Sequence, residues 1–319
     1  MTAMRPPSRV AGMAKASQPA SGRPRRYSLH GTAVEAAKPA PGLYLVATPI
    51  GNLSDITLRA LEVLAGADVI ACEDTRVTRR LTERYGIDTP LASYHEHNAA
   101  EARPKLLARL TEGQAVALVS DAGTPLISDP GYKLVRAAQE ACHPVTAIPG
   151  ASSVLTALNV AGLPTDRFFF EGFLPPKQAA RQKRIATLKL IPATLVLFES
   201  GPRLSVTLAD LAEGLGPRAA AICRELTKLH EEVRRGDLVT LARDYAAGAE
   251  TRGEIVLVVA PPADEADAVD IDALLRHALT RVSLKDAVGE VALASGRPRR
   301  EVYQRALALT KDSGDGAAH

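Results

Sequence analysis

One stretch of the chain, 115–131 (AVALVSDAGTPLISDPG), narrows the possible folds more than any other. Its first six residues are almost all apolar, which is typical of a buried strand. A carboxylate, Asp121, follows the strand directly and opens a turn of small and rigid residues. Asp129 then predicts a helix cap, with Pro130 at the first helical position, where its missing N–H costs nothing. The stretch therefore predicts a strand, an acidic turn and a capped helix.

The same alternation of short apolar strands with helices runs through the first half of the chain. It predicts an α/β fold with a parallel sheet, because strands that alternate with helices at this spacing need crossover connections. The strands of this N-terminal domain, 43–163, are expected at 43–48, 67–72, 91–94, 115–120 and 144–148.

A smaller mixed α/β domain is predicted at 164–262, and a helical tail at 268–312. The strands of the second domain are expected at 168–171, 193–199, 218–223 and 254–260, with helices at 177–189 and 202–213. In the tail, Ser283 and Asp286 resemble a capping box. The segment 295–298 (SGRP) separates two short helices, as in a helix-turn-helix.

Charge is distributed unevenly along the chain. Residues 1–42 contain seven Lys or Arg and one acid, so their net charge is +6. Because the whole chain has a net charge of +3, the remaining residues carry −3. The basic pI is therefore no argument for nucleic-acid binding, which would need local patches. This 1–42 extension lacks periodicity and is predicted to be disordered. A solvated tail, an over-long start before Met13, an RNA-binding arm and an organellar transit peptide all remain open.

The cysteine count and the hydropathy indicate where in the cell the protein is expected. Three widely separated cysteines provide neither a disulfide framework nor zinc spacing, which indicates a reducing, cytoplasmic location. No apolar run approaches the roughly 18 residues that a membrane span requires, so no membrane partner is expected.

Four polar turns follow strands of the predicted parallel sheet. Because the carboxyl ends of parallel strands meet at one edge, we expect a ligand site there. Neither glycine-containing turn is a P-loop or a dinucleotide fingerprint, which disfavours nucleoside triphosphates and NAD but not an adenosine-like ligand. The four turns are Thr48–Asn52, Glu73–Arg76, His95–Asn98 and Asp121–Pro125.

Several of these residues also have structural interpretations. Asp121 could cap its own turn, and Glu73 and Asp74 could pair with Arg76 or Arg79. The spacing of His95 and His97 suits a metal, but no Cys or third His lies near them in sequence, so no metal site is expected. The cationic run 181–184 and the arginines at 297, 299 and 300 could be solvated helix faces, or they could hold RNA.

Taken together, a series of short motifs resembles the tetrapyrrole methylase superfamily, and within it the branch that methylates a cytidine ribose 2′-hydroxyl in the decoding region of small-subunit (16S) ribosomal RNA. The resemblance spans about 43–312. The motifs are Leu45–Leu53, Glu73–Arg76, Ser120–Pro125, Asp129–Gly131, Pro149–Gly150, Glu171–Pro175, Phe198–Ser200 and Arg224–Lys228.

The resemblance implies two α/β domains that bind S-adenosylmethionine between them, usually in a homodimer. It implies an S-adenosylmethionine-dependent methyltransferase whose partner is the RNA of the small ribosomal subunit. The helical tail would match that of the family, with an RNA contact as its expected role. The cofactor contacts would map onto Thr48, Pro49, Asp121, Gly123, Thr124 and Phe198.

Methyl transfer to a hydroxyl requires alignment of the reactants and a general base. The candidate bases are Glu73 or Asp74, and then Lys228 or Glu199.

Two other functions remain open. A small-molecule tetrapyrrole or corrinoid methylase would carry a Gly-x-Gly-Pro-Gly-Asp first loop, where this chain has TPIGNL. A non-catalytic ribosome-assembly factor would have lost transfer.

Overall fold

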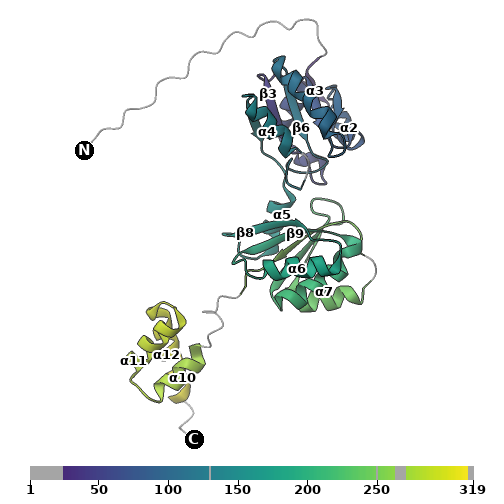
Figure 1. The fold of residues 1–319 in the computed structure, drawn as a ribbon. Coiled ribbons are helices and arrows are strands. Elements are labelled where there is room, and N and C mark those ends of the chain that lie inside the picture. Colours follow the sequence, from purple (N-terminus) through teal and green to yellow (C-terminus); the bar gives the residue numbers. More distant parts are fainter. Residues whose placement is uncertain (1–23, 129–130, 249–250, 263–270, 315–319) are drawn as a thin grey trace, which may run out of the picture. The chain divides into compact units, whose positions relative to one another are not determined.

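The computed structural model describes residues 24–128, 131–248, 251–262 and 271–314 (Figure 1). The chain divides into two compact units, with the boundary between Ala151 and Ser152. The helix cap predicted at Asp129 and Pro130 lies outside the described residues. Among the described helices, none combines the length and the apolar character that crossing a bilayer demands.

The first unit contains a five-stranded, fully parallel sheet in the order β5-β4-β6-β3-β7. This confirms the predicted parallel α/β fold, and all five predicted strands are present. The strands are β3 (Gly42–Val46), β4 (Val69–Cys72), β5 (Leu91–Ser93), β6 (Ala115–Val119) and β7 (Val145–Ile148).

Helices cover both faces of this sheet. On one face, α1 (Leu58–Gly66) and α2 (Thr75–Arg84) contribute to one apolar core, and a short 3₁₀ turn, η1 (Leu53–Asp55), precedes them. On the other face, α3 (Ala99–Thr111) and α4 (Tyr132–Glu140) contribute to a second core. Burial on two faces explains why the strands are apolar without alternation.

A β-hairpin precedes the sheet, so the predicted disorder of 1–42 is wrong for residues 26–35. Strands β1 (Arg26–Leu29) and β2 (Thr32–Glu35) pair antiparallel. Gly31, with φ of +82°, suits the two-residue turn between them. Tyr27 is 4% exposed and joins the core under α1. Tyr27, with the partly buried Leu29 and Val34, anchors this short segment to the core, which a composition-based prediction cannot detect.

The second unit contains a mixed five-stranded sheet in the order β11-β10-β12-β9-β8. Four of its strands match predicted ones: β8 (Phe168–Phe173), β9 (Thr194–Ser200), β10 (Ala219–Arg224) and β12 (Glu254–Val259). The sequence analysis missed β11 (Glu232–Asp237) and α8 (Leu238–Ala246). Strand β11 lies at an edge of the sheet and reads EVRRGD, so its sequence lacks the apolar pattern of a strand.

The helices of this unit also cover both faces of its sheet. Helices α6 (Gln178–Leu188), α7 (Leu204–Leu215) and α8 share a core with the inward residues of β9, β10 and β12 (Figure 1). A 3₁₀ turn, η2 (Gly201–Arg203), links β9 to α7.

Helix α5 (Ser153–Ala161) belongs to the second unit, so the predicted domain boundary at 163/164 is placed too late. The Cys223 thiol in β10 lies 4.0 Å from the carbonyl oxygen of Ala157. The Arg235 side chain in β11 donates to the carbonyl oxygen of Ala161 at 3.1 Å. The regular alternation assigned α5 to the preceding strand, but its packing partner is the following sheet.

The tail consists of α10 (Ile271–Leu279), α11 (Leu284–Ser295) and α12 (Arg299–Gly314), which enclose an apolar core of their own. The predicted capping box is confirmed, because the Ser283 hydroxyl oxygen accepts from the backbone N–H of Asp286 at 3.3 Å. The predicted helix-turn-helix is also confirmed, and Gly296 at the end of α11 has a φ of +68°.

Asp68, between α1 and β4, fastens the N-terminal segment to the sheet. Its carboxylate pairs with Arg25 at 2.9 Å and with Lys38 at 3.1 Å, and it accepts from the backbone N–H of Ala115 at 2.8 Å. Burial raises the pKa of Asp68, but the hydrogen bond from Ala115 and the two cations outweigh it, so the pKa lies below its ordinary 3.8.

We expect Asp68→Asn to lower the free energy of unfolding by about 1–3 kcal/mol near neutral pH, since it removes two charged partners and weakens the bond to Ala115. A carboxyl with a lowered folded-state pKa stabilises the fold above its unfolded pKa, and this contribution disappears as the pH falls through the folded value. The difference from wild type in urea unfolding should therefore be full at pH 7, begin to shrink near pH 4, where the unfolded-state carboxyl takes up its proton, and vanish only below the lowered pKa of Asp68.

The exposed Asp88→Asn is the matched control for that experiment and should leave the unfolding free energy nearly unchanged. A deficit in Asp68→Asn that persists unchanged down to pH 3 would show that the carboxylate charge is not what anchors the segment.

Candidate functional site

The four polar turns predicted to meet do so in the first unit. Because β3, β4, β5 and β6 are parallel and adjacent in one sheet, Thr48, Glu73, His95 and Asp121 follow strands that end at the same edge. We call the turns 48–52, 73–76, 95–98 and 121–125 the acidic rim. The convergence that the sequence predicted is therefore confirmed by the strand register.

Two of these turns are bonded directly to each other. The backbone N–H of Thr48 donates to the carbonyl oxygen of Gly123 at 2.9 Å, and the N–H of Gly123 donates back at 3.0 Å. The Thr48 hydroxyl donates to the carbonyl oxygen of Ser120 at 3.2 Å, and Thr48 is only 4% exposed. The side chain of Thr48 thus shapes the turn, and any ligand would meet the backbone here.

Gly123 needs to be glycine for two reasons. Its φ of +79° disfavours other residues, and an added Cβ would lie 3.2 Å from the Ile50 side chain. Nearby, the Thr124 hydroxyl donates to the carbonyl oxygen of Ala151 at 3.2 Å, while Pro49 is buried. These residues build a rigid floor from closely packed turns.

This floor lies at a topological switch point of the sheet, between the ends of the neighbouring strands β3 and β6. The helix after β3, α1, covers one face of the sheet, whereas the helix after β6, α4, covers the other. The segments that follow β3 and β6 therefore leave these neighbouring strands toward opposite faces of the sheet. Open parallel sheets bind ligands at such points.

Asp121 links the floor to the next strand. Its Oδ1 accepts from the backbone N–H of Asp74 at 3.0 Å, which joins the ends of β6 and β4. Its Oδ2 accepts no hydrogen bond from the part of the chain that the structure describes. Asp121 therefore holds the neighbouring turn at Asp74, whereas its structural interpretation was a cap on its own turn, and its second carboxylate oxygen is available to a ligand.

Glu73 is a carboxylate of the rim with a raised pKa. Burial raises its pKa above the ordinary 4.5, and the negative charges of Asp121, Asp74 and Glu96 raise it further, against an opposing effect of His95. Its carboxylate forms no hydrogen bond or ion pair with the described residues. Such a group is a stronger proton acceptor than an ordinary glutamate.

Asp74 is occupied by its own helix. It caps α2 by accepting from the N–H of Arg76 at 2.8 Å and pairs with that residue's guanidinium at 2.6 Å. These bonds lower its pKa to about 2. The alternative that the rim carboxylates pair with Arg76 is thus confirmed for Asp74 but not for Glu73, and Asp74 is a weak base.

The neighbouring histidines His95 and His97 lie close to each other. Their ring centres lie 6.0 Å apart, and no group of three or more potential ligands gathers around a point anywhere in the described residues. The Nδ1 atom of His95 is buried and has no hydrogen-bond partner in the ranges that the structure covers.

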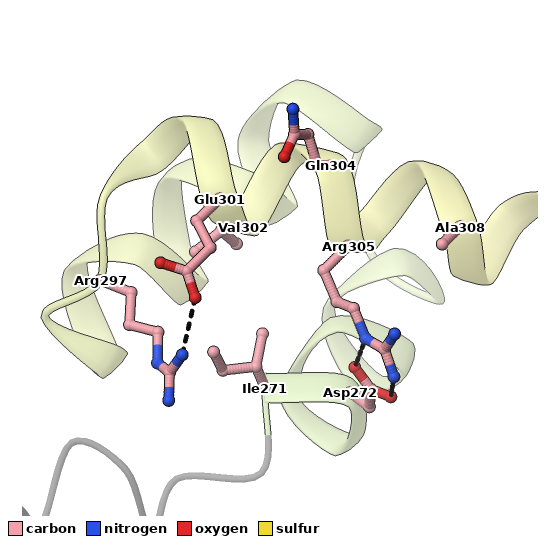
Figure 2. A pocket seen from close by; sticks show the side chains of 8 residues that line it. All are labelled: Ile271, Asp272, Arg297, Glu301, Val302, Gln304, Arg305 and Ala308. Atoms are coloured by element: carbon pink, nitrogen blue, oxygen red, sulfur yellow. Dashed lines mark hydrogen bonds and ion pairs between the residues drawn. The ribbon is translucent and has the colours of Figure 1, made fainter.

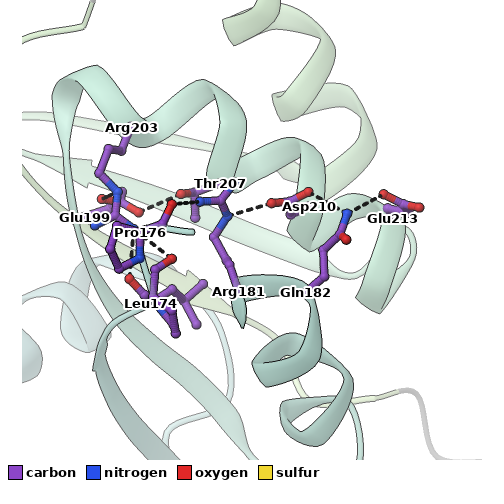
Figure 3. A network of polar contacts seen from close by, with 10 residues as sticks. Leu174, Pro176, Arg181, Gln182, Glu199, Arg203, Thr207, Asp210 and Glu213 are labelled. Atoms are coloured by element: carbon purple, nitrogen blue, oxygen red, sulfur yellow. Dashed lines mark hydrogen bonds and ion pairs between the residues drawn. The ribbon is translucent and has the colours of Figure 1, made fainter. Parts of the chain in front are cut away.

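Glu199 in the second unit is a structural carboxylate. It is 2% exposed, accepts from the Thr207 hydroxyl at 2.6 Å and from the N–H of Ser200 at 2.8 Å, and pairs with Arg203 at 3.4 Å (Figure 3). Both of its oxygens are used, so the geometry does not favour a catalytic role. Phe198 beside it packs edge-on against Phe170 at 4.9 Å between ring centres.

Lys228 is held by two carboxylates, Glu225 and Glu254, each at 2.9 Å. Burial lowers its pKa, but these bonds outweigh burial and raise the pKa above 10.5. Lys228 is therefore a charged donor rather than a base. The flanking Glu225 and Thr227 have φ values of +51° and +66°, a strain that sequence reasoning could not detect.

The cationic run on α6 is not a solvated face throughout. Arg181 is 4% exposed, pairs with Asp210 at 2.6 Å and donates to the carbonyl oxygen of Pro176 at 3.0 Å (Figure 3). Arg184 pairs with Glu171 at 2.6 Å. The hypothesis that this whole run is solvent-exposed is therefore wrong, because two of its cations complete internal ion pairs.

Comparison with known proteins gives the family. Residues 42–242 match the family profile described as tetrapyrrole (corrin/porphyrin) methylases, and residues 265–310 match one described as the RsmI C-terminal HTH domain. Among solved structures, uroporphyrin-III-C-methyltransferase from Thermus thermophilus is 25% identical, with a TM-score of 0.50 over 69% of this chain and 94% of its own. Diphthine synthase shares the fold: it is 19% identical, with a TM-score of 0.54 over 68% of this chain and 89% of its own.

Two curated relatives are similar over most of the chain, and both are named ribosomal RNA small subunit methyltransferase I. The protein from Mesorhizobium japonicum is 54% identical over 86% of this chain and 95% of its own length. That from Escherichia coli O157:H7 is 44% identical over 83% and 94%. With the parallel sheet, the acidic rim and the helical tail in place, the chain belongs to the tetrapyrrole methylase family.

Proposed function

We propose that this protein transfers a methyl group from S-adenosylmethionine to the ribose 2′-hydroxyl of a cytidine in small-subunit (16S) ribosomal RNA. The observation that supports this most directly is the acidic rim, where Asp121 and Glu73 stand beside rigid turns at the switch point of the first sheet. The names of the relatives provide the substrate class.

The residues of the rim suit the charge and shape of this cofactor. S-adenosylmethionine supplies, when bound, a methyl group already activated by a positively charged sulfonium. Asp121 would offer its unused Oδ2 to a positive or hydroxyl group, and Gly123 would let the backbone approach closely. Thr48, Pro49 and Thr124 would act through the shape of their turns, and Phe198 remains a predicted contact.

Glu73 is the base that the geometry favours. Its raised pKa makes it a better acceptor for the hydroxyl proton than Asp74, whose pKa is about 2. Lys228 is protonated and Glu199 is buried among its own donors. Glu73 would take the proton as the oxygen attacks the methyl carbon, and the floor of the rim would keep the reactants aligned.

The cellular location, the oligomeric state and the partner follow from the same proposal. The protein would act in the cytoplasm, as a homodimer, on the small ribosomal subunit or its RNA. Small-molecule tetrapyrrole methylation is the second candidate, supported by the solved relative that acts on uroporphyrin III.

We expect Glu73→Gln to reduce the rate of methyl transfer by about 10²–10⁴-fold, the usual contribution of a general base, with little change in cofactor affinity. Single-turnover transfer and calorimetry with S-adenosylmethionine measure the two effects. In the wild type the rate should fall as the pH drops through the raised pKa of Glu73, because protonation removes the base.

Asp121→Ala should act on binding first. It removes the ligand-facing oxygen and the acceptor for the Asp74 N–H, so we expect cofactor affinity to fall at least tenfold in calorimetry. Near-normal affinity in Asp121→Ala together with lost affinity in Glu73→Gln would mean that the two roles are exchanged.

The reaction itself is tested with labelled S-adenosylmethionine and small ribosomal subunits from cells that lack the enzyme, followed by mass mapping. We expect label on one cytidine ribose in the decoding region. Label on a tetrapyrrole precursor but not on RNA would support the small-molecule methylase. Cofactor binding without any transfer would support the assembly factor instead.

A further inference from the structure

We propose that one face of the helical tail, formed by Lys285, Arg299, Arg300 and Tyr303, binds RNA through backbone phosphates and one stacked base. We call these four residues the basic face. The inference rests on the proposed function, because it names the surface by which the same RNA substrate would be held.

The basic face lines a shallow depression of about 340 Å³, with Val288 in its floor. Lys285 and Val288 come from α11, whereas the other three residues come from α12. All four residues of the basic face are exposed, and Tyr303 has 45% of its surface in solvent. Three cations beside one flat ring match the chemistry of single-stranded RNA, which combines phosphates with stacking bases.

The cations of the basic face are not neutralised by the residues that the structure describes. No ion pair joins Lys285, Arg299 or Arg300 to any of the residues that the structure describes. Three other tail arginines behave differently: Arg281 pairs with Glu290 at 2.9 Å, Arg297 with Glu301 at 2.6 Å and Arg305 with Asp272 at 2.6 Å. Arg276 of α10 forms no ion pair with the described residues.

A second depression of the tail, drawn in Figure 2, makes the contrast visible. It measures about 520 Å³ and is lined by the paired residues Asp272, Arg297, Glu301 and Arg305 (Figure 2). Its two cations face two carboxylates, so its formal charge is zero. The unpaired positive charge is thus concentrated on the basic face.

The position of the arginines also works against stability. Arg299 and Arg300 occupy the first turn of α12, whose positive dipole end disfavours cations. Bound phosphate would turn this cost into a gain, since it would meet both the arginines and the N-terminal end of the helix. Residues 43–319 carry a net charge of −3, so RNA would need such a local patch.

The test compares two triple variants of the full-length protein with equal charge change. The basic-face variant replaces Lys285, Arg299 and Arg300 by Gln, and the control replaces Arg276, Arg281 and Arg305 by Gln. Fluorescence anisotropy would measure binding to a decoding-region 16S RNA fragment at several salt concentrations. We expect at least tenfold weaker binding and a salt slope reduced by about 2 in the basic-face variant, and smaller changes in the control.

A single variant sharpens the assignment. Tyr303→Leu should weaken RNA binding about five- to tenfold without altering the salt slope, since stacking carries no charge. Circular dichroism would verify the fold of each variant.

Equal losses in the two triple variants, or unchanged binding in the basic-face variant, would overturn the assignment of this face. Calorimetry with S-adenosylmethionine separates that result from a failure of the proposed function. A wild-type protein that binds the cofactor but no RNA would overturn both, whereas RNA methylation that is insensitive to the basic face would overturn only this inference.

Discussion

The mutual backbone bonds between Thr48 and Gly123 are the constraint on which the candidate site depends. They tie the turn after β3 to the turn after β6, at the point where the two chains leave on opposite faces of the sheet. Without this tie, two glycine-containing turns beside a switch point would be free to move. With it, the Asp121 carboxylate is presented from a rigid floor.

In the second unit, side-chain hydrogen bonds to backbone carbonyl oxygens likewise fix one segment of the chain. Arg203 donates to the carbonyl oxygen of Leu174 at 2.8 Å, and Arg181 donates to that of Pro176 at 3.0 Å (Figure 3). Their partners Glu199 and Asp210 are buried, so both ion pairs act inside the protein rather than on a ligand. These pairs hold the segment after β8 in one conformation. Carboxylates that look catalytic in sequence therefore serve to position the chain.

Charge is used in three different ways along the molecule. Asp68 collects two cations to fasten the N-terminal hairpin, whereas burial and then the negative charge of Asp121 raise the pKa of Glu73. The tail leaves Arg299 and Arg300 unpaired at a helix end that disfavours them. The first arrangement stabilises the fold, and the other two cost stability. Such costs are expected where a protein does chemistry or binds a charged partner.

The order of elements from β3 to β7, the parallel sheet and the convergence of the four turns were all available from the sequence. Short apolar runs with polar ends can form little else, and the parallel register follows from the crossover helices. Capping signals such as Ser283 were equally local and were predicted correctly.

The roles of individual side chains, by contrast, were decided only by the tertiary structure. Glu73 and Asp74 are neighbours in sequence, yet one is isolated and the other caps a helix. The ion pair that buries Arg181 spans 29 residues, and α5 packs on a sheet that follows it in the chain. Partners distant in sequence set burial and pKa, and these long-range contacts leave no periodic or local signal to read.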